Sequence, residues 1–330
     1  MFKKITSLLI LFFFIQINTE SFSYCPDKPI KKLGEHNALF LRKIKDVNLS
    51  AAQGVTIFND GKEKKIALSS GYWRNNTSIF DYKTGNVLHK ENLSIQKPSK
   101  LLASVLFYND KLWWSSYREE KLYSTNLKLK STESYSIPNL KYSVGLSASR
   151  ELDQIFIINR NKKKLVAFKP SEPAKIKSIN IKGLNHAPYD IDYYNKCLFF
   201  VESSHGKIWV INIDEVIKKK SNILLNYLPE VIEKIYDNYF LSIKPSLWFS
   251  DSKRIQHLDI YKDQLFVIDT DSFQIIQIYL NQNSYRKINL PTKHIFRGLA
   301  IPMEGKILLT GFETKDNLSE NKTAIFEFSF

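Results

Sequence analysis

Two short segments of the chain carry residue types that can hold a cation or move a proton. DIDYY contains Asp190 and Asp192, and HLDIY contains His257 and Asp259. Carboxylates and an imidazole that converge on one face can bind a divalent cation or act as acid and base. A structural role is equally open, because Asp commonly caps turns or hydrogen-bonds nearby backbone. The spacing lacks zinc-motif specificity, so we assign no metal ligands and no cofactor, and keep a divalent cation as an alternative.

Both segments belong to a unit that recurs six times along the chain. Each unit opens with an apolar strand, a second apolar strand follows after a short turn, and a third completes the pattern. Several strands repeated every ~40–50 residues predict a radial array of blades, so we expect an all-β, six-bladed β-propeller. Adjacent Trp113 and Trp114 should face opposite sides of their strand and pack between blades. The first strands start at Gly54, Ser104, Gly145, Asp190, His257 and Gly298.

Ligands of propellers gather where the first strands and the loops before them converge on the axis. Asp190 and His257 open the first strands of neighbouring blades. We therefore expect these two side chains to lie close enough to share one ligand or water. The candidate ligand-binding residues are Gln53, Tyr72, Asp190, Asp192, His257, Asp259 and Arg297.

Two segments depart from the repeat. Residues 38–49 form a lone strand, while the sixth unit has three strands and the chain ends at Phe330. The lone strand is predicted to supply the outer strand of the sixth blade and so close the ring. Residues 214–245 show apolar positions at i, i+3, i+4 and i+7, which predicts a small helical insert broken near Pro229.

The N-terminus has the pattern of a secretory signal. Lys3 and Lys4 precede an apolar run, and Ser21–Ser23 form a small-x-small site, so residues 1–23 are predicted to be a signal peptide. Residues 24–37 then form a polar lead-in, and 38–330 the propeller. We expect a secreted or periplasmic protein with no membrane span after removal of the signal.

Charge and cysteine content limit the partners. The formal net charge is +15, but the lysines are spread over the chain and no nucleic-acid motif occurs, so we expect no nucleic-acid partner. We expect a monomer. With two cysteines the chain is predicted not to be a disulfide scaffold, and Cys197 is interpreted as a small core residue.

Residues 38–330 resemble, in their spacing, the six-bladed propellers of the NHL-repeat and gluconolactonase-like superfamily. AAQGVTI from Ala51 and SSGYWRNNTSIFDYKTGNVL from Ser69 resemble the first blade of bacterial-type glutaminyl cyclotransferases, with Gln53 matching its Gln and Tyr72 its turn aromatic. Where that family has its catalytic Glu, this chain has Ser104 between Ala and Val. The metal set of gluconolactonase-like enzymes has a counterpart here only at the Asp190 or Asp192 position.

These patterns lead to one functional hypothesis and one alternative. The hypothesis is an exported, non-catalytic propeller whose polar axial funnel takes a small-molecule, peptide or protein ligand. The alternative is a metal-dependent hydrolase or lactonase using Asp190, Asp192, His257 and Asp259. The residues alone leave open whether the protein is an enzyme.

Overall fold

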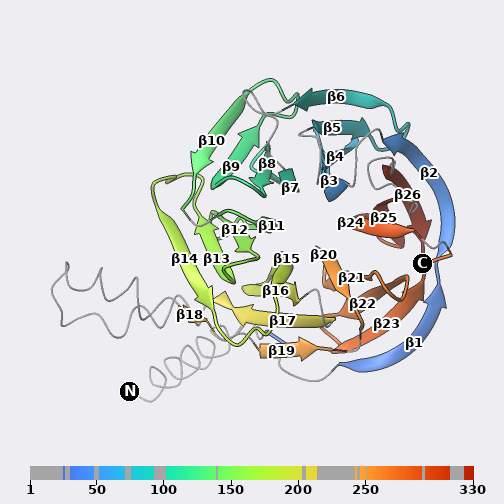
Figure 1. The fold of residues 1–330 in the computed structure, drawn as a ribbon. Helices are drawn as coiled ribbons and strands as arrows, with labels where there is room; N and C mark the ends of the chain where they lie inside the picture. Colours follow the sequence, from blue (N-terminus) through green and yellow to red (C-terminus); the bar gives the residue numbers. More distant parts are fainter. Residues whose placement is uncertain are drawn as a thin grey trace, which may run out of the picture.

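A computed structural model shows six β-sheets arranged around a central axis (Figure 1). The predicted six-bladed β-propeller is confirmed. We number the blades 1 to 6 in the order of their innermost strands. The structure describes residues 25–26, 30–47, 52–70, 76–92, 102–138, 140–202, 206–213, 242–243, 246–250, 252–291, 294–312 and 323–330.

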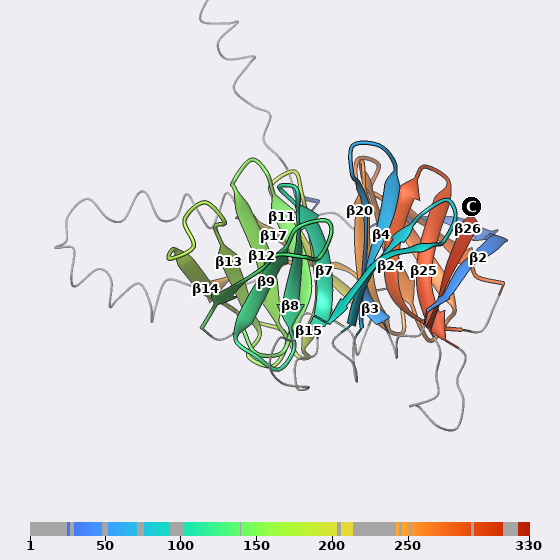
Figure 2. The same cartoon turned by 90° about the horizontal axis from the view of Figure 1, so that it is seen from above.

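The innermost strand of each blade is the first strand of its repeat. These six strands stand around the axis, and each contacts the innermost strands of the two neighbouring blades (Figures 1 and 2). Any side chain they turn toward the axis therefore faces five other strands. The six are β3 (Ala52–Asn59), β7 (Leu102–Tyr108), β11 (Ser143–Ser149), β15 (Pro188–Tyr194), β20 (Ile255–Tyr261) and β24 (Ile295–Met303).

The second and third strands pair antiparallel outward from each innermost strand. In blades 3 and 5, where the structure describes every connection between these strands, the connections are short turns, as the sequence pattern predicts. The second strands are β4 (Lys64–Ser70), β8 (Lys111–Ser116), β12 (Gln154–Asn159), β16 (Cys197–Glu202), β21 (Gln264–Asp269) and β25 (Lys306–Phe312). The third strands are β5 (Asn76–Asp81), β9 (Lys121–Thr125), β13 (Lys164–Phe168), β17 (Lys207–Asn212), β22 (Gln274–Tyr279) and β26 (Thr323–Ser329).

The outer strands vary more in origin. Blades 1 to 5 carry β6 (Val87–Asn92), β10 (Thr132–Ser136), β14 (Ile176–Ile181), β19 (Ser246–Phe249) and β23 (Ser284–Asn289), respectively. The outer strand of blade 6 is β2 (Leu39–Val47), which comes from the N-terminal side of the ring and pairs antiparallel to β26. Blades 3 and 5 have a fifth strand each, β18 (Ser242–Ile243) and β1 (Lys31–Asn37), and both additions are parallel.

Each blade is buried on both faces because it lies between two others. In β12, Ile155 and Ile157 pack into a cluster shared with blade 2, whereas Phe156 and Ile158 pack into a cluster shared with blade 4. Six such clusters occupy the six junctions between blades. This explains why the second strands are continuous apolar runs rather than alternating ones.

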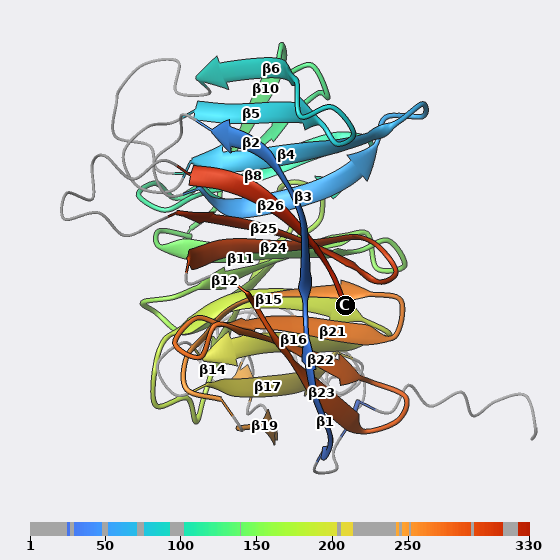
Figure 3. The same cartoon turned by 90° about the vertical axis from the view of Figure 1, so that its right-hand side faces the viewer.

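The segment predicted as a polar lead-in is in part a strand. Lys31–Asn37 forms β1 along β23 of blade 5, and the chain continues into β2 on blade 6. Figure 3 shows the two strands following one another across the outer edges of these blades. The sequence does not indicate β1, because most of its residues are polar and six of the seven are exposed. Its pairing is set by the neighbouring strand.

The two cysteines form a disulfide, which the sequence pattern does not predict. Cys25 bonds to Cys197 at the start of β16, across a sequence separation of 172 residues. Cys197 is also a core residue, as predicted, and is 3% exposed. The bond attaches Cys25 to blade 4, β1 pairs with blade 5 and β2 with blade 6, so the N-terminal part contacts three consecutive blades.

Two other predictions concern parts of the chain that lie outside the described residues. The signal peptide over 1–23 is one, and most of the helical insert over 214–245 is the other. Within that range the structure describes Ser242–Ile243, which form β18 and are not helical. The described residues contain no helix of sufficient length and apolarity to cross a bilayer.

Candidate functional site

A pocket, here called the axial channel, lies where the six innermost strands meet. Its volume is about 80 Å³. A water molecule needs roughly 10–15 Å³ of such space, whereas pockets for drug-sized ligands measure about 300–1,000 Å³. The channel therefore suits a few waters or one small chemical group. All six strands line it, through Gly54, Val55, Thr56, Ser104, Val105, Leu106, Leu146, Asp190, Ile191, Asp192, His257, Leu258, Asp259 and Leu299.

Asp190 and His257 meet at the junction of blades 4 and 5. Nδ1 of His257 lies 3.3 Å from Oδ2 of Asp190, and the same oxygen accepts a hydrogen bond from the backbone N–H of Leu258 at 3.2 Å. Oδ1 of Asp190 accepts from the N–H of Ile191 at 2.9 Å. The two residues are thus as close as the sequence predicts, and the carboxylate also joins β15 to β20.

A glycine allows Asp190 to take this position. A Cβ on Gly145 of β11 would lie 2.7 Å from Oδ1 and 2.8 Å from Cα of Asp190. Real Cβ atoms are not found that close to backbone, so any other residue would push β11 and β15 apart. Gly145 therefore sets the spacing of two strands that line the channel.

Asp192 lies two residues further along β15 and binds three donors. Oδ1 accepts from the hydroxyl of Ser147 at 2.6 Å and from the N–H of Tyr193 at 2.8 Å. Oδ2 accepts from the N–H of Ile260 in β20 at 2.9 Å. The hydroxyl of Ser147 also accepts from the N–H of Tyr193 at 2.8 Å. One carboxylate therefore joins three consecutive blades.

Asp259 repeats this arrangement one blade later. Its Oδ2 accepts from the N–H of Ile301 in β24 at 2.8 Å. Asp190, Asp192 and Asp259 thus each accept a backbone N–H from the next innermost strand. This is the structural role that the sequence left open for these Asp residues. Such bonds to charged acceptors contribute about 1.5–3 kcal/mol each.

Burial alters the acidity of two of these carboxyls. Burial raises the pKa of Asp192 to about 6, against the lowering effect of the Ser147, Tyr193 and Ile260 hydrogen bonds. The pKa of Asp259 is raised well above its ordinary value, first by burial and then by the negative charges of Asp192 and Asp190. The channel therefore holds carboxyl groups that compete for the same protons.

His257 is the least satisfied group in the channel wall. The residue is 6% exposed, and its Nε2 is buried without a hydrogen-bond partner. The ring of Tyr189 meets the imidazole edge-on, with centroids 5.4 Å apart. A buried polar atom without a partner is uncommon and calls for a ligand, a water or a strain explanation.

The remaining predicted site residues are not brought into this cluster. Arg297 donates from Nη1 to Oε1 of Gln256 at 2.9 Å, its Nε is buried without a partner, and it does not line the channel. Gln53 lies in β3, but its side chain is outside the described residues, as is all of Tyr72. Whether these three bind a ligand stays a prediction.

Sequence reasoning missed Ser147 and Gly145. Both lie in β11, for which the repeat pattern predicts a strand and no site residue. A usable signal exists, since Ser147 occupies the same offset from its strand start as Asp192 and Asp259 do from theirs. Comparing equal offsets across all six repeats would have selected it.

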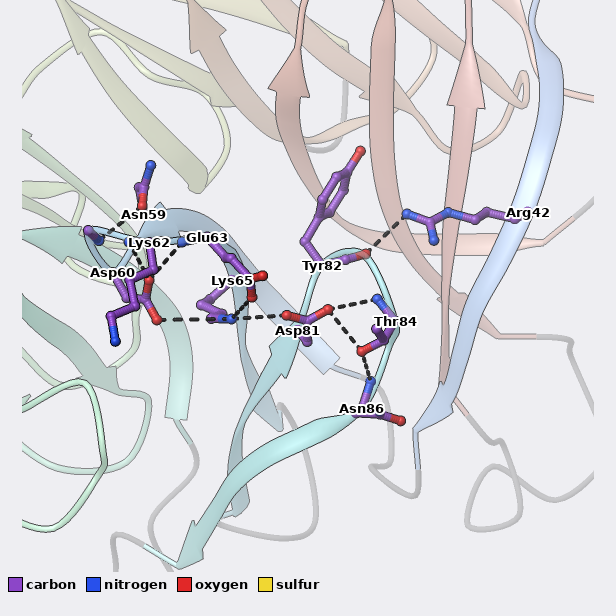
Figure 4. Close-up of polar contacts among 11 residues, drawn as sticks. Arg42, Asn59, Asp60, Lys62, Glu63, Lys65, Asp81, Tyr82, Thr84 and Asn86 are labelled. Carbon is purple, nitrogen blue, oxygen red and sulfur yellow. Dashed lines mark hydrogen bonds and ion pairs between the residues drawn. The ribbon is translucent and has the colours of Figure 1, made fainter.

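A second polar cluster, far from the axis, holds a turn of blade 1 (Figure 4). Nζ of Lys65 contacts Asp81 at 2.9 Å and Glu63 at 3.0 Å. Asp81 also accepts from the N–H of Thr84 at 2.7 Å, and hydrogen bonds from Thr84 and Lys65 hold its pKa far below the ordinary range. Arg42 of β2 donates to the backbone oxygen of Tyr82 at 3.0 Å. These groups satisfy one another, so we assign the cluster a structural role.

Comparison with known proteins identifies the fold. No protein-family model matches the chain, and no curated protein sequence does. Virginiamycin B lyase from Staphylococcus aureus is similar at TM-score 0.57 and 12% identity, covering 88% of each chain. A luciferin-regenerating enzyme is similar at TM-score 0.59 and 11% identity, covering 89% of this chain and 95% of that one. The WD40 repeats of RRP9 are similar at TM-score 0.61 and 10% identity, covering 88% and 99%.

At these identities the likeness shows the propeller fold and nothing finer. The three matched proteins have unlike names, and one fold supports many functions. Function must therefore be argued from the channel.

Proposed function

We propose that this chain is an exported, non-catalytic binding propeller, and that its axial channel receives one polar group of a small-molecule, peptide or protein ligand. The observation that carries the proposal is the polar lining of the 80 Å³ channel, where Asp190, Asp192, His257 and Asp259 lie on two neighbouring strands. A few convergent polar groups in a concave space are typical of ligand sites.

The negative charges of the channel support a ligand as well. Asp192 and Asp259 are both buried, which raises the pKa of each, and the negative charges of neighbouring channel carboxylates raise both pKa values further. Among the residues that the structure describes, His257 is the one ion-pair partner of the three channel carboxylates, through Asp190. Like charges buried together disfavour their own ionisation. A donor-bearing ligand would relieve this repulsion.

Binding without catalysis is the simpler use of these carboxylates. Both oxygens of Asp190 and of Asp192 already accept hydrogen bonds, mostly from backbone N–H groups. A general base needs a free acceptor within reach of the proton that it removes. Within the described ranges, no group of three or more His, Cys, Asp or Glu is placed to hold a metal ion. No observation specifically favours the metal-dependent hydrolase or lactonase.

Export is supported by the signal pattern of residues 1–23 and by the Cys25–Cys197 bond. Structural disulfides persist in secreted and periplasmic compartments and are rare in reducing ones. We propose that the mature protein acts there as a monomer.

Titration calorimetry with simple probes tests this function. Methylammonium, acetate and acetamide present a cationic, an anionic and a neutral group of similar size. We expect at least one of them to bind the wild type at one site and to bind Asp259→Asn at least tenfold more weakly. Glu151→Gln, which changes an exposed carboxylate outside the channel, is the matched control and should bind like the wild type.

Failure of all three probes, or equal binding by Asp259→Asn, would overturn the proposal. Hydrolysis of a simple lactone in the presence of added calcium or zinc, lost in Asp259→Asn and kept in Glu151→Gln, would replace it by the enzymatic alternative. Both readouts use the same three proteins.

A further inference from the structure

The exposed large apolar side chains gather on one side of the ring. Among the described residues there are six of them, between 41% and 68% exposed, and all belong to the outer strands of blades 5, 6 and 1. Figure 3 views the ring from this side and shows β1 and β2 crossing its outer edge. The six, here called the rim patch, are Leu33 in β1, Leu39, Phe40 and Leu41 in β2, and Val87 and Leu88 in β6.

Contacts join these strands into one surface. β1 and β2 follow one another in the chain with a single residue between them. Arg42 of β2 donates to the backbone oxygen of Lys83, in the turn that leads into β6. The same turn lies against the end of β2, since a Cβ on Gly85 would lie 2.5 Å from the backbone oxygen of Ile44. Exposed apolar side chains that cluster in this way, rather than scatter singly, are typical of an interaction surface.

The surroundings of the rim patch are basic. Residues 31–47 contain five Lys or Arg against two Asp or Glu, and residues 82–90 contain two lysines and no acid. Lys45 and Lys83 are exposed, and neither pairs with a carboxylate among the described residues. A partner for this surface should therefore combine an apolar layer with negative charge.

The charges argue against a second copy of the chain as that partner. A twofold contact would bring the same lysines of two copies together, and like charges that face one another disfavour an interface. An acidic protein fits less well than a membrane, because six of the seven flanking cations are lysines and Lys is depleted from protein–protein interfaces. Lysines beside exposed Leu and Phe are instead typical of segments that lie on anionic bilayers.

From this combination we infer that the rim patch docks the protein, by its outer edge, on a lipid bilayer that contains anionic headgroups. Leu39 and Leu41 enter the boundary of the acyl chains, while the long side chains of Lys45 and Lys83 reach the headgroup phosphates. The contact is peripheral and needs no membrane-spanning segment. The outer strands carry the rim patch and the innermost strands line the axial channel, so the inference goes beyond the proposed function and does not depend on it.

Co-sedimentation of the mature protein with vesicles tests the inference. One set of vesicles consists of phosphatidylcholine alone, and the other of phosphatidylcholine mixed with phosphatidylglycerol. In roughly 0.1 M salt, where the Debye length is about 10 Å, the wild type should bind the anionic vesicles about tenfold or more tightly than the neutral ones.

Two double variants separate the apolar from the charged contribution. Leu39→Ser/Leu41→Ser removes two exposed apolar side chains and should weaken binding about tenfold, an effect that salt does not screen. Lys45→Gln/Lys83→Gln should weaken binding by about fivefold for each lysine in low salt. In about 1 M salt, where the Debye length is about 3 Å, the second variant should bind like the wild type.

The matched control removes the same charge from another part of the ring. Lys130 and Lys182 are exposed beside β10 and β14, on the opposite side from β2 (Figure 1). Lys130→Gln/Lys182→Gln should bind the vesicles like the wild type. Asp259→Asn should do so as well, so a failure of the channel proposal would leave the membrane contact standing.

Four results would overturn the inference. Equal weakening by the control pair, or no effect of Leu39→Ser/Leu41→Ser, would mean that net charge alone attracts the protein to the vesicles. A wild-type dimer in analytical ultracentrifugation that dissociates in Leu39→Ser/Leu41→Ser would assign the rim patch to a second copy. Binding of polyglutamate in place of vesicles, weakened by the same variant, would assign it to an acidic protein. If circular dichroism showed that this variant does not fold, Val87→Ser/Leu88→Ser would replace it, with the same expected result.

Discussion

The imidazole of His257 and the carboxylate of Asp190 lie in contact across the junction of blades 4 and 5, with Nδ1 3.3 Å from Oδ2. The same oxygen of Asp190 also accepts a hydrogen bond from the backbone N–H of Leu258. Asp190 therefore joins two blades and also lines the axial channel.

Removing one hydroxyl should weaken the junction of blades 3 and 4. Ser147→Ala deletes the donor to Asp192 and an acceptor for the N–H of Tyr193, in a position that is 1% exposed. We expect a loss of about 1–2 kcal/mol in the free energy of unfolding. The hydrogen bond from Ser147 lowers the pKa of Asp192, so in the variant the pKa of Asp192 should lie above about 6.

Denaturant unfolding and carboxyl NMR measure the two effects of Ser147→Ala. Ser134→Ala, on the exposed side of the outer strand β10, is the control and should stay within ~0.5 kcal/mol of the wild type. An unchanged stability together with an unchanged pKa would show that Ser147 does not join the blades.

The buried carboxyls predict an unusual dependence of stability on pH. A carboxyl whose pKa is raised on folding binds protons more tightly in the folded state, so stability falls as pH rises from its unfolded pKa, ~3.9, toward its folded pKa. For Asp192 that window ends at about 6. Asp259→Asn removes one such group, whose pKa is raised by burial and by the charges of Asp192 and Asp190. We expect the variant to lose about 1–3 kcal/mol less than the wild type between pH 4.5 and 7.

Chemical denaturation at a series of pH values checks this slope. Glu151→Gln should retain the wild-type slope. A slope for Asp259→Asn as steep as that of the wild type would mean that Asp259 ionises normally in the folded protein.

Reduction of the Cys25–Cys197 bond should destabilise the ring at its N-terminal attachment. The bond closes a loop with a sequence separation of 172 residues, and the loss of such a bond costs about 2–5 kcal/mol. Cys25→Ser leaves Cys197 in its core position, and its free energy of unfolding should equal that of the reduced wild type. Adding reductant to Cys25→Ser should not change its stability further. If reductant left the stability of the wild type unchanged, the Cys25–Cys197 bond would not stabilise the ring.

Glu327 should contribute more to the stability of the fold than an exposed glutamate does. Its side chain is 2% exposed and accepts from Nε of Arg42 at 2.7 Å and from the hydroxyl of Tyr82. It therefore joins β2, β26 and the turn of blade 1. Glu327→Ala should cost about 1–3 kcal/mol, since it leaves a half-exposed Arg42 and a buried hydroxyl without their partner.

The matched control for Glu327 is Glu304→Ala. Glu304 pairs with Lys262 at 2.7 Å, but both side chains are more than half exposed, and such pairs contribute ~0–1 kcal/mol. Thermal and denaturant unfolding measure both variants. Equal losses in their free energy of unfolding would show that the contacts of Glu327 stabilise the protein no more than an exposed ion pair does.

The repeat pattern was sufficient to predict the blades and part of the site. Six matched strand triplets predicted six sheets, and strand alternation predicted that Trp113 and Trp114 face opposite sides, where they lie in different junction clusters. Equal placement at the start of adjacent innermost strands predicted the meeting of Asp190 and His257. These features depend on periodicity, which sequence records directly.

What the sequence could not predict depends on long-range geometry. Nothing in the chain indicates that Cys25 and Cys197 would be adjacent, because their proximity follows from the path of β1 around blade 5. The strand β1 itself is polar and exposed, and is defined only by its partner β23. The use of carboxylates to bind the backbone of the next blade requires the distance between blades, which no residue pattern encodes.

Binding of a small probe in the axial channel tests the central claim most directly. Titration calorimetry of methylammonium, acetate and acetamide against the wild type, Asp259→Asn and Glu151→Gln measures it. The account predicts that at least one probe binds the wild type at one site, that Asp259→Asn weakens this binding at least tenfold and that Glu151→Gln leaves it unchanged. Binding of no probe, or equal binding by Asp259→Asn, would contradict the account.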